Sequence, residues 1–386
     1  MPTEADVEPL PTRRTHEILP IIFWALFLQL FLLIAVSFVM QFGPLFVTRF
    51  IFGLDFADFY NAAGDWLAGM DPYARGRLYT PPSSILVGLA FHWTSFAIAR
   101  LLFFFINIAL VYASLRALSR QFQLTRANES ALLGITAVFY PFYFLVERGN
   151  LDGIMLALLV FGFRSRNSLF RAGMVGASLA VKVYTGLMVL VLLRKRSWKV
   201  AGLAVLVVLL LQVPFAALAP NFIQAVSGRS ELFRMDENIS PAALFKLVLF
   251  AAGGDFWKLA FLLTWAATLL VRLLHAGGGD LRETWPTFVP WMISFPIVVY
   301  PYSGVLALSL VALIAAHAQQ RKILNSEAVV LIGFGLLGFQ AIAWTAFGAR
   351  SALALVLIHS ICSLGTLLML LGACWLPQYG NNAEAS

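Results

Sequence analysis

The stretch ILPIIFWALFLQLFLLIAVSFVM, residues 18–40, decides the fold class of this chain. It holds no charged side chain, and as a helix it is long enough to cross a hydrocarbon core of about 30 Å. It is too long for the core of a signal peptide, and no small-residue cleavage pattern precedes Gln41. We therefore expect a membrane anchor here and not a leader.

The composition extends this prediction to the whole chain. Of the 386 residues, 60% are hydrophobic and 12% are charged, and the mean hydropathy is +0.84. Such a chain lacks the polar side chains that cover a water-soluble protein. Peptide groups in hydrocarbon must be hydrogen-bonded within the protein, so membrane segments are helices or closed barrels. Runs of about twenty apolar residues favour helices, and we predict an all-α, polytopic membrane protein.

The basic residues give the orientation. A formal net charge of +8 raises the question of a nucleic-acid partner. The positive charges instead gather in alternate loops between apolar runs, which is the pattern of cytoplasmic loops. We place these clusters in the cytoplasm: Arg13 and Arg14; Arg116, Arg120 and Arg126; Arg164, Arg166 and Arg171; Arg194, Lys195, Arg196 and Lys199; Arg321 and Lys322.

Threading the apolar runs between these clusters predicts a bundle of about 12 membrane segments. The segments are expected to start near Ile18, Thr94, Ser130, Leu151, Leu169, Val183, Val200, Phe256, Trp285, Ser303, Glu327 and Ser351. The domain organisation is then a cytoplasmic N-terminal tail at 1–17, a single transmembrane domain at 18–377 and a cytoplasmic C-terminal tail at 378–386. No internal repeat of fixed period indicates a second unit.

Lys182 is the sharpest polar signal within an apolar run. The segments that start near Leu151 and Leu169 are short, and Lys182 interrupts the second. Short or broken helices at membrane depth usually line a cavity. A lysine in hydrocarbon is costly unless it reaches water or an anion. Lys182 could therefore bind a phosphate, or it could extend its ammonium group to the outer interface.

Two long loops, at about 41–93 and 221–255, lie outside the cell in this topology, and we expect the chemistry there. The first is acidic, and residues 55–69 have helical spacing, which is typical of a helix lying in the membrane interface. Its apolar side would carry Phe56, Phe59, Ala63, Trp66 and Leu67. Asp65 is expected at the surface, and Asp71 is expected in a turn with Pro72 and Tyr73.

Six short motifs follow one another in the chain. They read DFADFYNAA at 55–63, GMDPY at 69–73, YTPP at 79–82, GNLD at 149–152, KVY at 182–184 and NIS at 238–240. Their order resembles glycosyltransferase family 87, which is of GT-C type and includes bacterial mannosyltransferases that use polyprenyl-phosphate mannose. The chain differs from the family pattern at Asn150, where Gln is usual, and at Val183, where Pro is usual. Tyr300-Pro301-Tyr302-Ser303 also lacks the histidine that the family often carries near this point.

The resemblance implies a catalytic GT-C membrane domain on the extracytoplasmic side of the cell membrane. It implies inverting transfer of a hexose, mannose first among them, from a polyprenyl-phosphate donor to a lipid-linked or cell-envelope glycan acceptor. The partners are then the donor, the acceptor and membrane lipids, without nucleic acid.

Asp55 is the expected catalytic base. It follows the first predicted crossing, where a lipid-phosphate sugar would present its anomeric carbon. A carboxylate placed there can take the proton of the attacking acceptor hydroxyl. Alternatively, Asp55 caps the interfacial helix, since aspartate is a favoured N-cap. Asp58, three residues further, either assists as a second catalytic carboxylate or is solvated.

Donor-binding residues are expected in several motifs. Lys182 and Arg148 would hold the donor phosphate, although Arg148 could instead form a surface pair with Glu147. Asn150 and Asp152 could bind sugar hydroxyls, with helix capping as the alternative for Asn150. The remaining expected contacts of the donor are Tyr60, Tyr73, Tyr184, Tyr302, Asn238 and Ser240. Anchoring in the membrane interface is the alternative role of the tyrosines.

No metal-ligand spacing, phosphate-binding glycine loop or dinucleotide fingerprint occurs in the sequence. We expect neither a metal nor a cofactor, and a nucleotide sugar is a poor candidate donor. A multi-pass transporter or lipid flippase remains the competing function, because broken helices and an intramembrane lysine are natural there too. A structural subunit that has lost catalysis is a third alternative. Transporters tend to have matching halves, whereas the polar features of this chain cluster outside.

Overall fold

A computed structural model describes residues 53–76, 78, 80–227, 241, 244–245, 256–277, 279–294, 301–321, 323–338 and 352–377. Within these ranges all regular structure is helical, which confirms the predicted all-α class. The predicted first crossing at 18–40, the tails, Tyr79, Asn238, Ser240 and Tyr300 lie outside the described residues.

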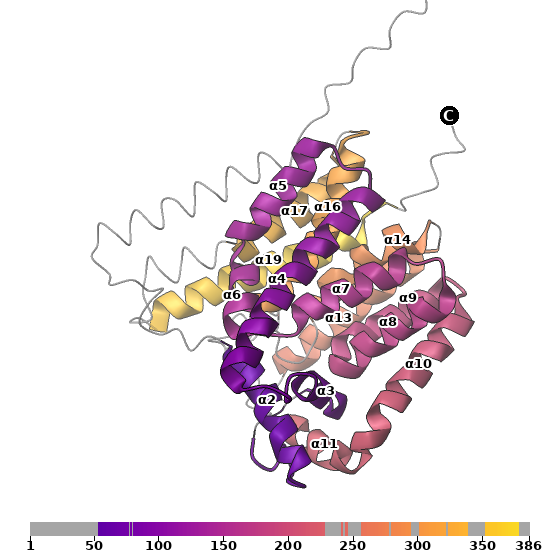
Figure 1. Cartoon of the computed structure of the whole chain (residues 1–386). Coiled ribbons are helices and arrows are strands. Elements are labelled where there is room, and N and C mark those ends of the chain that lie inside the picture. The colour runs from indigo at the N-terminus through magenta and orange to yellow at the C-terminus, as the bar shows by residue number, and fades with distance from the viewer. Residues whose placement is uncertain are drawn as a thin grey trace, which may run out of the picture.

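The helices follow the apolar runs of the sequence (Figure 1). The longest are α4 (Phe96–Gln121), α10 (Trp198–Gln212), α13 (Phe256–His275) and α19 (Ala352–Cys374). The shorter α-helices are α2 (Leu54–Leu67), α3 (Ile85–Leu89), α5 (Arg126–Val138), α6 (Tyr140–Arg148), α7 (Asp152–Arg164), α8 (Ser168–Val181), α9 (Leu187–Arg194), α11 (Ala219–Ser227), α14 (Leu281–Thr284), α15 (Val289–Ile293), α16 (Ala307–Ala318) and α17 (Asn325–Gly338). Short 3-10 turns are η1 (Pro82–Ser84), η2 (Val183–Gly186), η3 (Val213–Leu218), η6 (Trp285–Phe288) and η7 (Pro301–Leu306).

Several of these helices are suited to a membrane. By length and composition, Phe96–Gln121, Trp198–Ala225 and Phe256–His275 can each cross a bilayer. Arg126–Val138 and Tyr140–Arg148 form a fourth span if the bent pair is counted as one. The predicted total of about twelve stays a prediction, since most of the other apolar helices in the described ranges are shorter than the roughly 20 residues of a simple span.

The loops at one end of the bundle are tied together by hydrogen bonds. Gln121 Nε2 donates to the Arg282 carbonyl (3.2 Å), and the Thr125 N–H donates to Gln319 Oε1 (2.8 Å). Arg194 Nε donates to the Leu273 carbonyl (2.7 Å), and Lys195 Nζ to the Gly279 carbonyl (2.9 Å). We call this end, with the loops at 121–126, 164–168, 194–198, 275–281 and 318–325, the basic end. The arginines and lysines between 116 and 199 that we predict to be cytoplasmic belong to it, as does Arg321.

The opposite end carries α2, α3 and α11, which lie together at the bottom of Figure 1. Here the N-terminal part of α4 lies beside Gly53, because a Cβ atom on Gly53 would come within 2.8 Å of the Arg100 side chain. Gln212, at the end of α10, accepts a hydrogen bond from the Ser83 N–H (3.2 Å). α4 runs the whole way between the two ends, a length of about 39 Å at 1.5 Å per residue.

A bend between α5 and α6 directs the chain toward this opposite end. The two helices meet at 55°. Phe139 between them is extended, and Pro141 lies in the first turn of α6. An N–H in the first turn has no acceptor within its own helix, so the missing N–H of proline costs no hydrogen bond there. The end of α6 reaches α2, since the Gly53 N–H donates to the Glu147 carbonyl at 2.7 Å.

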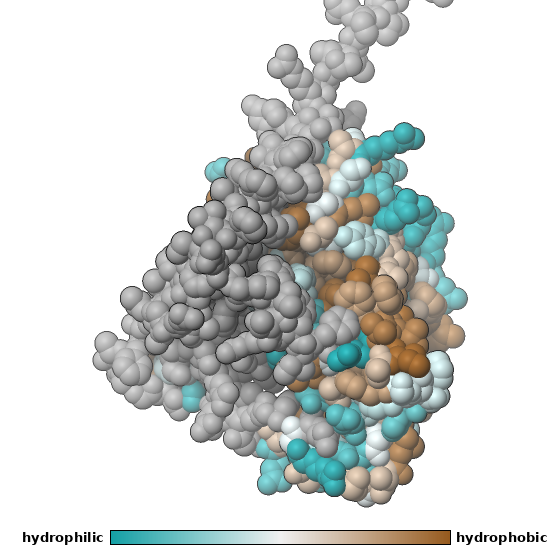
Figure 2. Space-filling model, turned by 60° about the vertical axis from the view of Figure 1, so that its left-hand side comes forward, coloured by the Kyte–Doolittle hydropathy of each residue, from teal (hydrophilic) through white to brown (hydrophobic). Residues whose placement is uncertain are grey.

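The outside of the described helices is strongly apolar. In Figure 2, brown, hydrophobic residues gather at mid-height in the coloured right-hand part of the face, and most of the teal, hydrophilic residues lie above and below them. Exposed apolar side chains lie on α4, α10 and α13, among them Leu101, Phe105, Leu209, Leu210 and Leu263. An apolar surface of this extent fits a lipid environment, because lipid does not penalise exposed hydrocarbon.

The interior packs around α16 and a close helix crossing. Every residue of α16 except His317 is buried, which places this helix in the centre of the bundle. α17 and α19 approach closely at Gly333 and Gly365: a Cβ atom on Gly333 would lie 2.4 Å from the Gly365 carbonyl oxygen. Small residues at such a crossing allow the two backbones to touch.

This crossing makes a testable prediction. We expect Gly333→Ala to destabilise the protein by about 1–3 kcal/mol, because the added methyl group must push α19 away. Gly335 lies on the same helix, and a Cβ atom added there would meet no neighbouring element within 4 Å. Gly335→Ala is therefore the matched control and should leave stability unchanged or slightly raised. Thermal unfolding in detergent measures both. Equal unfolding temperatures for the two variants would contradict the close crossing.

Candidate active site

Asp55 lies in the first turn of α2. The N-cap of this helix is Gly53, with a left-handed backbone at φ 75°, and no side chain caps the helix. The alternative that Asp55 is the N-cap is therefore wrong. A carboxylate in the first turn is still favoured there, because the positive end of the helix dipole lies close to it. The side chain is free to form bonds to other elements of the fold.

The turn between α6 and α7 packs directly against α2. Gly149 ends α6 with φ 66°, and a Cβ atom at this position would lie 2.9 Å from Phe56 Cβ and 3.2 Å from Gly53 Cα. Both the conformation and the close contact therefore require glycine. The N–H groups of Gly149 and Asn150 donate to the Leu145 carbonyl at 3.0 and 3.1 Å, which fixes the turn.

This turn brings two donors to the Asp55 carboxylate. Arg148 Nε lies 3.0 Å from Oδ1, and Asn150 Nδ2 donates to Oδ2 at 2.6 Å. The Arg148 guanidinium also lies over the Phe144 ring, 5.6 Å from its centroid. The structure thus pairs Arg148 with Asp55, a partner 93 residues away, whereas the sequence suggested Glu147 as the local alternative.

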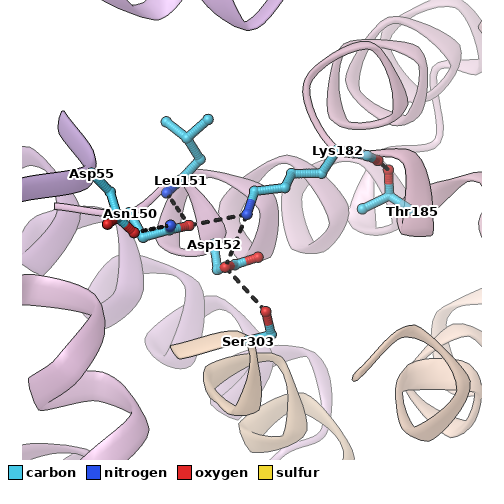
Figure 3. Close-up of polar contacts among 7 residues, drawn as sticks. All are labelled: Asp55, Asn150, Leu151, Asp152, Lys182, Thr185 and Ser303. Atoms are coloured by element: carbon cyan, nitrogen blue, oxygen red, sulfur yellow. Dashed lines mark hydrogen bonds and ion pairs between the residues drawn. The ribbon is translucent and has the colours of Figure 1, made fainter. Parts of the chain in front are cut away.

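Lys182 breaks a helix, as predicted. It ends α8 with an extended backbone (φ −138°, ψ 116°) before η2 begins. Its Nζ donates to Asn150 Oδ1 at 3.1 Å and lies 3.6 Å from Asp152 Oδ2 (Figure 3). Only 12% of the side chain is exposed. Lys182 therefore binds an anion inside the protein, and does not extend its ammonium group to the interface.

The anion that Lys182 contacts, Asp152, is the first residue of α7 and is fully buried. Its Oδ2 also accepts a hydrogen bond from Ser303 Oγ at 3.2 Å. Its Oδ1 is buried and has no hydrogen-bond partner among the described residues. Tyr184, whose ring centroid lies 5.8 Å from Lys182 Nζ, likewise has a buried hydroxyl without such a partner there.

We call Asp55, Arg148, Asn150, Asp152, Lys182 and Ser303 the polar network. Figure 3 shows how it runs from Asp55 through the Asn150 amide to Lys182 and on to Asp152 and Ser303. It combines two carboxylates with two cations, so its formal charge is balanced. An arrangement of this kind can accept a proton at a carboxylate and hold an anion at a cation.

Ser303 is the member that sequence reasoning missed. It belongs to η7, in the segment Tyr300-Pro301-Tyr302-Ser303 that lacks the family's histidine. A serine in an apolar run is common and does not by itself indicate a functional site. The position of Ser303 in this segment was therefore the only indication that the sequence offered. The predicted donor contact Tyr302 precedes Ser303 in η7. The structure describes its backbone there but not its side chain.

Other predicted site residues lie outside the contacts of this network. Tyr60 Oη donates to the Thr94 carbonyl at 2.7 Å, and its ring packs on His92 and Phe96, so it fixes α2 to the start of α4. Tyr73 Oη donates to the Thr80 carbonyl at 2.6 Å. Burial raises the pKa of this phenol, and the Asp71 charge raises it further. Asp58 lies one helical turn beyond Asp55 and is partly exposed.

α2 confirms most of its predicted apolar face. Phe56, Phe59 and Ala63 are buried, but Leu67 is 60% exposed because α2 ends there and the chain turns away. The expectation of a surface position for Asp65 is wrong: it is buried and pairs with Arg75 at 3.2 Å, since the turn after α2 folds back over it. Asp71 forms the predicted turn by accepting the Tyr73 N–H at 2.8 Å.

The buried pair makes a stability prediction. Asp152→Asn should lower the free energy of unfolding by about 3 kcal/mol, because it leaves the Lys182 charge buried beside a neutral group. Adding Lys182→Met should recover part of the loss. Denaturant unfolding in detergent measures each step.

The matched control is Glu129→Gln at the basic end. Glu129 is half-buried and lies 3.7 Å from the exposed Arg116, and loss of this surface pair should cost less than about 1 kcal/mol. Equal losses for Asp152→Asn and Glu129→Gln would show that Asp152 and Lys182 do not interact as the geometry indicates.

The chain was compared with known proteins. The family model of glycosyltransferase family 87 matches residues 78–285, more than half of the chain. Comparison with curated proteins gave no match, and comparison with solved structures gave none. The matched range contains Arg148, Asn150, Asp152 and Lys182, while Asp55 and Ser303 lie on either side of it. Because the match covers most of the bundle and four of the six members of the polar network, the chain belongs to glycosyltransferase family 87.

Proposed function

We propose that this glycosyltransferase is an inverting enzyme of GT-C architecture with about twelve membrane segments. It transfers a hexose, mannose first among the candidates, from a polyprenyl-phosphate donor to a lipid-linked or cell-envelope glycan acceptor. One observation carries the proposal: the Asp55 carboxylate and the Lys182 ammonium group are held by the same Asn150 amide, at 2.6 and 3.1 Å. A base and an anion-binding cation are the two groups that such a transfer needs.

The reaction follows from these two groups. Asp55 accepts the proton of the acceptor hydroxyl while that oxygen attacks the anomeric carbon of the hexose. The bond between this carbon and the phosphate oxygen breaks from the opposite face, and polyprenyl phosphate leaves with the electron pair. The configuration at the anomeric carbon inverts, and no covalent enzyme intermediate forms. Lys182 and Arg148 stabilise the charge of the leaving phosphate.

Arg148 contributes at both stages of the transfer. Before the reaction it pairs with Asp55 Oδ1 at 3.0 Å. When Asp55 takes up the proton it loses its negative charge, and at the same moment the departing phosphate gains one. The attraction of Arg148 to Asp55 then falls while its attraction to the phosphate rises. Arg148 thus orients the base first and stabilises the leaving group afterwards.

The charge pattern supports an extracytoplasmic site. Asp55, Arg148, Asn150 and Lys182 lie toward the end of the bundle opposite the basic end, because α7 and α8 each run between the network and the basic loops. Basic loops favour the cytoplasmic side. In this orientation a polyprenyl lipid reaches the network from the outer leaflet, with its phosphate near the membrane surface.

The catalytic prediction concerns Asp55. We expect Asp55→Asn to lower the turnover by at least about 10²–10⁴-fold, the usual contribution of a positioned general base. The measurement is release of free polyprenyl phosphate from reconstituted enzyme given a panel of polyprenyl-phosphate hexoses. Glu129→Gln, the same change of acid to amide at the basic end, should retain wild-type turnover.

Two results would overturn parts of this proposal. Wild-type turnover in Asp55→Asn removes Asp55 from the mechanism. Release from none of the donors with the wild-type protein contradicts the polyprenyl-phosphate donor and favours the transport alternative.

The orientation makes a separate prediction. Asn61 is exposed on α2, and Arg164 is exposed at the basic end of α7. In right-side-out vesicles a membrane-impermeant maleimide should label Asn61→Cys directly and Arg164→Cys only after permeabilisation. The wild-type chain is the control, because both native cysteines, Cys362 and Cys374, are buried. The reverse labelling pattern would place the network on the cytoplasmic side and contradict the proposal.

A further inference from the structure

The Asn150 side chain makes three contacts with three different elements. Its Nδ2 donates to Asp55 Oδ2 on α2 at 2.6 Å. Its Oδ1 accepts from the Leu151 N–H at 2.7 Å, at the start of α7, and from Lys182 Nζ at 3.1 Å, at the end of α8. Asn150 therefore connects the carboxylate and the ammonium group of the polar network through a single planar amide.

The partners fix which way this amide lies. The Leu151 N–H and Lys182 Nζ are donors only, so the amide atom facing them is the oxygen. The Asp55 carboxylate is an acceptor when ionised, so the atom facing it is the nitrogen. Turning the amide over would oppose like groups at all three contacts. Both lone pairs of Oδ1 are also in use, which leaves that oxygen without capacity for a sugar hydroxyl.

The backbone around Asn150 is fixed as firmly as the side chain. Its N–H bonds to the Leu145 carbonyl, and the left-handed Gly149 before it is wedged against Gly53 and Phe56. Asn150 itself is 3% exposed. Because the backbone and the side chain of this buried residue are both hydrogen-bonded, Asn150 cannot move without losing hydrogen bonds. It therefore holds its partners at fixed distances from one another.

We infer that Asn150 is a positioning residue that sets the placement of Asp55 relative to Lys182, and hence of the base relative to the donor phosphate. This inference rests on the proposed function, in which the two groups act on opposite faces of the anomeric carbon. Asn150 does not touch the reacting atoms. Its role is to hold the base and the cation at the separation that in-line displacement requires.

Three substitutions of Asn150 separate this role from a purely local contact with the Leu151 N–H at the start of α7. Asn150→Asp keeps the oxygen that accepts from Leu151 and Lys182, and it loses only the N–H that bonds to Asp55. Asn150→Ala removes all three contacts. Asn150→Gln keeps the same amide on a side chain one methylene longer.

We expect Asn150→Asp and Asn150→Ala each to lower kcat by about 100-fold, the effect of misplacing a catalytic group by about 1 Å. In Asn150→Ala, which adds no charge beside Lys182, the donor KM should change by less than about 3-fold. Asn150→Gln should recover at least about tenfold of the kcat that Asn150→Ala loses. Asn150 does not cap α7, whose N-cap is Leu151 and which no side chain caps. A purely local role, limited to the contact with the Leu151 N–H, would leave kcat of Asn150→Asp near wild type because that contact is kept, and that result would overturn the inference.

A second measurement does not depend on activity. Asn150→Asp places two carboxylates at hydrogen-bond distance, so it should lower the thermal unfolding temperature. Adding Asp55→Asn exchanges the amide and the acid and should recover part of the loss, but not all of it, because Arg148 then loses its carboxylate partner. Failure of the second change to recover any of the loss would show that the two side chains are not in contact, and would overturn the inference.

The two measurements also separate this inference from the proposed function. If the wild-type protein releases polyprenyl phosphate but Asn150→Asp turns over normally, the glycosyltransferase proposal stands and the positioning role fails. If the wild-type protein shows no release from any donor, the proposed donor fails. The unfolding experiment then still decides whether Asn150 joins Asp55 to the network.

Discussion

A charge inside an apolar bundle must be met by an opposite charge or by hydrogen bonds, and this constraint shapes the polar network. Lys182 and Ser303 satisfy this constraint by contacting the Asp152 carboxylate. Each charged member of the network lies at a helix end: Asp55 in the first turn of α2, Arg148 last in α6, Asp152 first in α7, and Lys182 just after α8. The helix breaks are therefore what allow charged groups to meet at one place.

The lengths of α7, α8 and α16 set the distance between the polar network and the basic end. α7, α8 and α16 contain 13, 14 and 12 residues. At 1.5 Å per residue they reach about 18–21 Å from the basic end, about half the length of α4. A hydrocarbon core is about 30 Å thick. In the orientation proposed above, Asp152 and Lys182 thus lie below the outer surface, and Asp55 on α2 lies nearer to it, as an acceptor arriving from outside requires.

The sequence predicted the helical class, the break at Lys182 and five of the six network members, because each is a polar residue in an apolar run or belongs to a matched motif. It could not predict their partners. Asp55 meets Arg148 and Asn150 across 93 and 95 residues, and those contacts depend on the bend before α6 and on the wedge at Gly149. Ser303 carried no local signal, since its role exists only beside Asp152.

The charge balance of the network favours an enzyme over a passive binding site for anions. Two carboxylates offset two cations, so a phosphate that enters competes with Asp55 and Asp152 for Arg148 and Lys182. A site for simple anion binding gains nothing from such competitors. In the transfer proposed above, however, the competition from Asp55 ends when it takes up the acceptor's proton, because Arg148 is then released to the leaving phosphate. In that proposal, Asp55 makes the attraction of Arg148 for the phosphate strongest during the transfer, when this attraction lowers the barrier.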